Sequence, residues 1–124
     1  MFYYLSIAAG GAFGAMARFG LMTLVDGLSD SRFPLGTLVV NVVGSILIGV
    51  CFVLITERLL MSEEMRAVLV VGFIGAFTTF STFSLDALVL LQYGYILQSL
   101  LYIFASVLLC ILGTWAGMSL MRAL

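Results

Sequence analysis

Four long apolar stretches fill this chain, separated by short clusters of charged and turn-forming residues. They cover about 2–25, 35–58, 63–92 and 96–122. A helix of roughly 20 mainly apolar residues crosses the hydrocarbon layer of a membrane, and each stretch reaches that length. The pattern therefore predicts an all-α membrane protein, in which residues 1–124 form a single domain of four transmembrane helices.

Capping and turn signals define the ends of the third stretch. The segment 62–64, Ser-Glu-Glu, is typical of a helix N-terminus, because serine caps the first turn and carboxylates favour its positive end. Residues 87–121 carry no charge, which is too long a run for one span, and Tyr-Gly-Tyr at 93–95 predicts a turn within it. The fourth helix is therefore expected to begin at about residue 96.

Within the third stretch, Gly72, Gly75 and the β-branched pair Thr78 and Thr79 weaken the helix in mid-membrane. The sequence permits a break near 75–79 without requiring one. Lipid tolerates broken backbone only where it is buried in protein or lines a cavity, and its freed carbonyl groups can coordinate a cation.

Composition agrees with a lipid environment. Hydrophobic residues make up 64% of the chain and charged residues 9%, against about 25% charged in an average soluble domain. The net charge is −1, with five arginines and no lysine, which excludes nucleic acid as a partner. The sequence has no histidine and offers no pair of nucleophile and base, so we do not expect an enzyme.

Thirteen glycines are spread through the apolar stretches rather than collected in linkers. Gly10 and Gly14 are four residues apart, and so are Gly113 and Gly117. This spacing lets helix backbones approach closely in lipid, so we expect tight packing of the helices.

Four spans put both termini on the same side of the membrane. Arg58, Arg66 and Arg122 then lie on that side, whereas Arg18 and Arg32 lie nearer the other. A difference of three against two is too small to fix the orientation by the positive-inside rule. We therefore expect the chain to insert either way up and to form an antiparallel, dual-topology homodimer with an inverted copy.

Polar side chains in the second stretch share one helix face. Thr37, Asn41 and Ser45 are spaced by four residues in the segment GTLVVNVVGSILIG. The amide of Asn41 has two N–H donors, which can hold an anion. An interhelical hydrogen bond that only stabilises the bundle explains this segment equally well.

Aromatic residues in GFIGAFTTFSTFSLD, residues 72–86, have helical spacing. Phe73, Phe77, Phe80 and Phe83 predict one aromatic stripe, with hydroxyl side chains on a neighbouring face. The edge of a phenyl ring is positive, so it can meet a small dehydrated anion. Core packing is the alternative explanation for such a stripe.

Arg18 is the one charged residue inside the first stretch. Its fork of N–H donors is suited to anions, which would place it at the mouth of a pore. The alternative is an arginine that extends to the membrane surface.

In this order and spacing, the segments GAMARFG, GTLVVN and GFIGAFTTFSTF resemble the Fluc/CrcB family of microbial fluoride channels over essentially the whole chain. The resemblance implies an antiparallel homodimer in the bacterial plasma membrane, with narrow pores and a sodium ion (Na+) at the dimer centre. It also implies passive export of fluoride from the cytoplasm, which protects the cell from fluoride toxicity.

The resemblance further implies roles for individual residues. Gly75 and Thr78 would hold sodium through their carbonyl groups, and the fluoride path would be lined by Arg18, Asn41, Phe80, Ser81, Thr82, Phe83 and Tyr102. Phe19 stands where the family often has tyrosine, and Asp86 stands where we expect glutamate.

Other small membrane proteins fit less well. A proton-coupled exporter of the small multidrug-resistance type needs a carboxylate in its first span, and residues 1–25 contain no Asp or Glu. The hypothesis of a purely structural helical subunit does not explain why Arg18 and Asn41 lie in membrane-spanning stretches.

Overall fold

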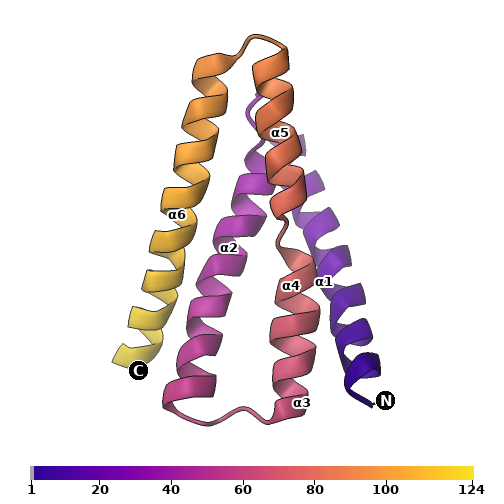
Figure 1. Cartoon of the computed structure of the whole chain (residues 1–124), viewed down its shortest axis with the longest axis vertical. Coiled ribbons are helices and arrows are strands. Elements are labelled where there is room, and N and C mark those ends of the chain that lie inside the picture. The colour runs from indigo at the N-terminus through magenta and orange to yellow at the C-terminus, as the bar shows by residue number, and fades with distance from the viewer. Residues whose placement is uncertain (1) are drawn as a thin grey trace.

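The computed structural model describes residues 2–124 as a bundle of helices (Figure 1). In chain order the elements are α1 (Phe2–Gly27), α2 (Leu35–Phe52), the π-helical segment η1 (Val53–Glu57), α3 (Glu63–Arg66), the π-helical segment η2 (Ala67–Ile74), α4 (Gly75–Phe77), α5 (Phe80–Gln92) and α6 (Ile96–Ala123). They combine into four segments long and apolar enough to cross a membrane: Phe2–Gly27, Leu35–Glu57, Glu63–Gln92 and Ile96–Ala123. The prediction of four transmembrane helices is confirmed.

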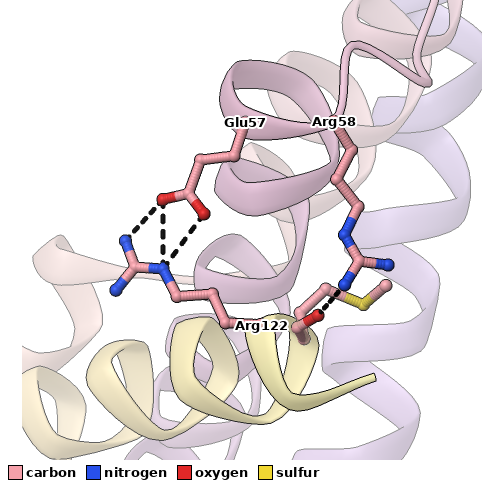
Figure 2. A network of polar contacts seen from close by, with 4 residues as sticks. Glu57, Arg58 and Arg122 are labelled. Carbon is pink, nitrogen blue, oxygen red and sulfur yellow. Dashed lines mark hydrogen bonds and ion pairs between the residues drawn. The ribbon is translucent and has the colours of Figure 1, made fainter.

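Both termini lie at one end of the bundle, together with the connection between α2 and α3 (Figure 1). The connections between α1 and α2 and between α5 and α6 lie at the opposite end. Arg58 and Arg122 lie together at the end of the termini (Figure 2), and Arg32 lies in the connection between α1 and α2 at the opposite end. Arg18 lies inside α1.

Many large apolar side chains lie on the outside of the bundle, unlike those of a soluble protein. Phe104 and Trp115 of α6 are 72% and 65% exposed, and similar residues line the outer surface of every span. Because lipid solvates apolar groups, their exposure carries no hydrophobic penalty in a membrane. The interior is built around Tyr102, Val40, Val53 and Ser99, each less than 2% exposed.

Glycines allow the helices to pack this closely. A methyl group added to Gly10 or Gly14 of α1 would collide with backbone carbonyls of Val68 or Phe73. One added to Gly117 of α6 would collide with the carbonyl of Ile46 in α2. The close packing predicted from the glycine spacing is thus confirmed for α1 against η2 and for α6 against α2.

The predicted ends of the third and fourth helices are also confirmed. Ser62 accepts a hydrogen bond from the backbone N–H of Met65 at 3.2 Å and caps α3. Gly94 has φ of 82°, and the N–H groups of Gly94 and Tyr95 bond to the carbonyls of Leu91 and Leu90. These two hydrogen bonds end α5 at its C-terminus. They require a left-handed backbone conformation at Gly94, which glycine adopts most easily.

An ion pair joins the end of η1 to the end of α6 (Figure 2). Nε and Nη2 of Arg122 both donate to Oε1 of Glu57, at 3.0 and 2.5 Å. Nη2 of Arg58 donates to the carbonyl of Met121 at 2.6 Å. Because both side chains are exposed to solvent, which screens their charges, the pair contributes little to stability and mainly fixes where the two helix ends meet.

The packing of α1 makes a testable prediction. Gly14→Ala should destabilise the protein by roughly 1–3 kcal/mol, because the new methyl group meets rigid backbone of η2. Gly20→Ala in the same helix meets nothing within 4 Å and should unfold at the same temperature as the original chain or higher. Thermal unfolding in detergent, monitored by gel filtration, compares the two variants. Equal losses of stability at both positions would count against glycine-dependent packing.

Candidate functional site

The third span is interrupted at Thr78 and Thr79. α4 ends at Phe77 and α5 begins at Phe80, and the two threonines between them have extended backbone, with φ/ψ of −85°/160° and −152°/115°. Broken backbone inside a membrane needs protein partners for its polar groups, because no water is present to satisfy them. The surrounding side chains supply these partners.

Asn41 of α2 is hydrogen-bonded to the backbone of Thr79 through both the nitrogen and the oxygen of its side-chain amide. Its Nδ2 donates to the Thr79 carbonyl at 2.9 Å, and its Oδ1 accepts from the Thr79 N–H at 2.8 Å. A side-chain amide carries two N–H donors, so one of them stays available after this pairing. Asn41 therefore holds the interrupted backbone and keeps a donor for another group.

The same pairing changes the helix just before the interruption. In an unbroken helix the Gly75 carbonyl would accept from the Thr79 N–H, four residues later. That N–H is bonded to Asn41 instead, so the Gly75 carbonyl loses its helical partner. The Thr78 carbonyl, within the interruption itself, accepts a long hydrogen bond of 3.4 Å from Nη1 of Arg18 in α1.

The hydroxyl of Thr79 organises the start of α5. Its Oγ1 accepts from the Thr82 N–H at 3.2 Å, which caps the helix, and lies 3.0 Å from Oγ1 of Thr82 and 3.3 Å from Oγ of Ser81. Ser81 and Thr82, predicted to line the fluoride path, are thus joined in a hydroxyl cluster with Thr79.

A cavity of about 570 Å³ opens beside the interruption, between α2, the third span and α6. It brings together five of the residues predicted from the sequence, Asn41, Gly75, Thr78, Phe80 and Phe83. The other lining residues are Gly44, Ser45, Ile48, Val70, Ile74, Thr79, Ser106, Val107, Cys110 and Ile111, so the wall is apolar with a few hydroxyls, one amide and no charge.

The prediction of a single aromatic stripe is wrong. Phe73 stacks on Phe77 at 5.8 Å between ring centres, whereas Phe80 contacts Phe83 at 5.3 Å with the rings tilted by 47°. Phe77 is 4% exposed and Phe80 is 78% exposed. The extended backbone at 78–79 breaks the helical phase, so the rings before and after it point in different directions.

Tyr102 lies outside the cavity lining but touches it through Phe83. The two ring centres are 5.3 Å apart. The Tyr102 hydroxyl donates to Oδ2 of Asp86 at 3.3 Å, and Oγ1 of Thr37 donates to the same oxygen at 2.7 Å. The carboxylate therefore gathers two hydroxyls at one end of the aromatic pair.

Ser106 of α6 also belongs to this site, although sequence reasoning missed it. Its buried Oγ has no hydrogen-bond partner among residues 2–124, and the residue lines the cavity. The available signal was the four-residue spacing of Tyr102, Ser106, Cys110 and Thr114, which puts their side chains on one face of α6.

Known proteins match almost the whole chain. The family described as "CrcB-like protein, Camphor Resistance (CrcB)" matches residues 5–118. A protein of Hahella chejuensis named fluoride-specific ion channel FluC is 47% identical over 116 residues, which cover 94% of this chain and 91% of the relative. Two further relatives have the same name. The protein of Geobacter sulfurreducens is 47% identical over 97% of both chains. The protein of Rhizobium meliloti is 44% identical over 100% of this chain and 99% of the relative. The chain belongs to the CrcB family.

Proposed function

We propose that this chain is a fluoride-selective ion channel of the bacterial plasma membrane. It lets fluoride leave the cytoplasm passively and so protects the cell from fluoride toxicity. The observation that carries the proposal is the cavity beside the interrupted third span, whose uncharged wall combines a held amide, hydroxyls and phenyl rings. The names of the relatives support the identity of the ion.

The chemistry of the wall suits a small anion that loses its water. Fluoride accepts hydrogen bonds, and two groups can donate them here: the second N–H of Asn41 and the hydroxyl of Ser106, which has no partner among residues 2–124. Phe80 and Phe83 can present positive ring edges to the ion between these donors. With no charge in the wall, selectivity rests on pore size and on single donors, which a larger halide cannot use equally well.

A second, inverted copy would complete this path. The Phe80 ring is 78% exposed and Gly75 is also exposed, although both belong to the site. The wall of the cavity thus includes residues exposed on the surface of the chain, so a single chain does not enclose an ion. An antiparallel homodimer, which the divided arginines also favour, would cover this face with the same residues of the partner.

We further propose that sodium occupies the axis of this dimer. The support is the Gly75 carbonyl, which loses its helical donor, and the Thr78 carbonyl, whose hydrogen bond from Arg18 is long at 3.4 Å. Carbonyl oxygens are ligands for hard cations, and two copies related by symmetry would bring four of them together. Sodium would then be structural, holding the two interruptions face to face.

The function is tested by efflux from liposomes that contain the purified protein. Fluoride should leave at least about tenfold faster than chloride, because the path offers single donors and ring edges instead of a wide cationic funnel. Ion-selective electrodes for the two halides measure the rates. Equal rates would reject the proposed selectivity.

Substitutions in the path should separate transport from packing. Phe80→Ile, Phe83→Ile and Ser106→Ala should each reduce fluoride efflux, the two phenylalanine changes by about tenfold or more, because they remove the ring quadrupole or a hydroxyl donor. The folded protein should remain, since a volume-conserving apolar change usually costs less than about 1.5 kcal/mol.

Two matched variants control this experiment. Phe73→Ile alters a ring that stacks on Phe77 before the interruption, and Ser6→Ala removes a hydroxyl that bonds to the Phe2 carbonyl within α1. Both should keep near-normal efflux in the same assay. A matched loss at Phe73, Phe80 and Phe83 would instead assign the rings to packing.

The antiparallel dimer, which the axial sodium site requires, is tested by the topology of the termini. A single cysteine added after Leu124, in a variant lacking Cys51 and Cys110, should react with a membrane-impermeant reagent from both sides of the membrane. Roughly half of the chains should be labelled from each side, because the arginine balance gives no strong preference. Labelling from one side alone would remove both the antiparallel pair and the shared sodium site.

A further inference from the structure

A second cavity lies at the end of the bundle opposite the termini. Its volume is about 430 Å³, and it is lined by Arg32, Val89, Leu90, Tyr93 and Tyr95. Arg32 belongs to the connection between α1 and α2, and the tyrosines belong to the connection between α5 and α6. These connections lie at the same end of the bundle (Figure 1), where the apolar spans reach the membrane surface.

Arg32 is held at this cavity by Tyr95. Its Nη1 donates to the Tyr95 hydroxyl, and its guanidinium carbon lies 5.0 Å from the centre of the Tyr95 ring. Tyr95 is fixed in turn, because its backbone N–H bonds to the Leu90 carbonyl at 2.9 Å. The charged end of the arginine is therefore positioned at the cavity.

The charge of Arg32 has no partner of opposite sign in the part of the chain that the structure describes. Within residues 2–124 the ion pair found is that of Glu57 and Arg122, at the other end of the bundle. Asp26 accepts from the backbone N–H of Gly36, and Asp30 is exposed without an ion pair. Tyr95 uses one N–H of a guanidinium that has five, so most of the fork remains available.

We propose that this cavity binds the phosphate headgroup of an anionic phospholipid. A guanidinium fork matches two phosphate oxygens, and tyrosines near the membrane surface are suited to headgroups. Val89 and Leu90 form an aliphatic wall against which the start of an acyl chain can lie. The chain as a whole has a charge of −1, so attraction of an anionic lipid depends on this local site and not on the overall field.

Native mass spectrometry of the delipidated protein with phosphatidylglycerol or phosphatidylcholine tests the site. The affinity for phosphatidylglycerol should fall about fivefold in Arg32→Gln, as expected for the loss of one arginine near the headgroups. Arg32→Lys keeps the charge but loses the fork of donors. Its affinity for phosphatidylglycerol should lie between those of the original chain and Arg32→Gln. Arg66→Gln, an exposed arginine of α3 near the opposite end, is the matched control and should bind as the original chain does.

Several outcomes would overturn the proposal. One is equal lipid affinity in the original chain and Arg32→Gln, and another is the same loss in Arg66→Gln, which would indicate a general charge effect. Displacement of the lipid by excess inorganic phosphate would assign the site to free phosphate. Dissociation of dimers in Arg32→Gln with unchanged lipid affinity would assign the cavity to contact with a second copy.

Discussion

The structure depends on one requirement, that backbone exposed by a break inside the membrane must be hydrogen-bonded by protein. Thr78 and Thr79 interrupt the third span, Glu63–Gln92, near its middle, where lipid supplies no hydrogen bonds. Asn41 supplies an acceptor and a donor to Thr79 at 2.8 and 2.9 Å, in the same way as a neighbouring strand would. An amide is the side chain that can do both without carrying a charge.

The features of the candidate site follow from this pairing. Because the Thr79 N–H bonds to Asn41, the Gly75 carbonyl loses its helical donor. Because the backbone at 78–79 is extended, the Phe80 ring is exposed on the surface of the chain. The Thr79 hydroxyl starts α5 and gathers Ser81 and Thr82 around it. A single interruption thus produces the free carbonyl, the exposed ring and the hydroxyl cluster that the proposed channel uses.

The sequence predicts features whose signals lie close together along the chain. The four spans, the Ser62 cap and the turn at Gly94 each depend on a few neighbouring residues, and all are present. The partner of Asn41 is 38 residues away, and no local pattern specifies it. The π-helical segments and the divided aromatic rings also went unpredicted, because helical spacing assumes an unbroken helix with a constant phase.

The same limit explains why Ser106 was missed. Ser99 and Ser106 are both buried hydroxyls in the apolar sequence of α6. The four-residue spacing that includes Ser106 places it on one helix face but does not show which of the two serines lacks a partner. In the structure Ser99 donates to the Ala87 carbonyl at 2.8 Å, whereas Ser106 faces the cavity beside Asn41 with no partner among residues 2–124. Tyr102 is different again, since its hydroxyl is directed to Asp86 and it meets Phe83 with its ring. Among residues 2–124, Ser106 therefore brings an unbonded hydroxyl to the cavity that Asn41 also lines, while the hydroxyls of Thr37 and Tyr102 are already bonded to a carboxylate.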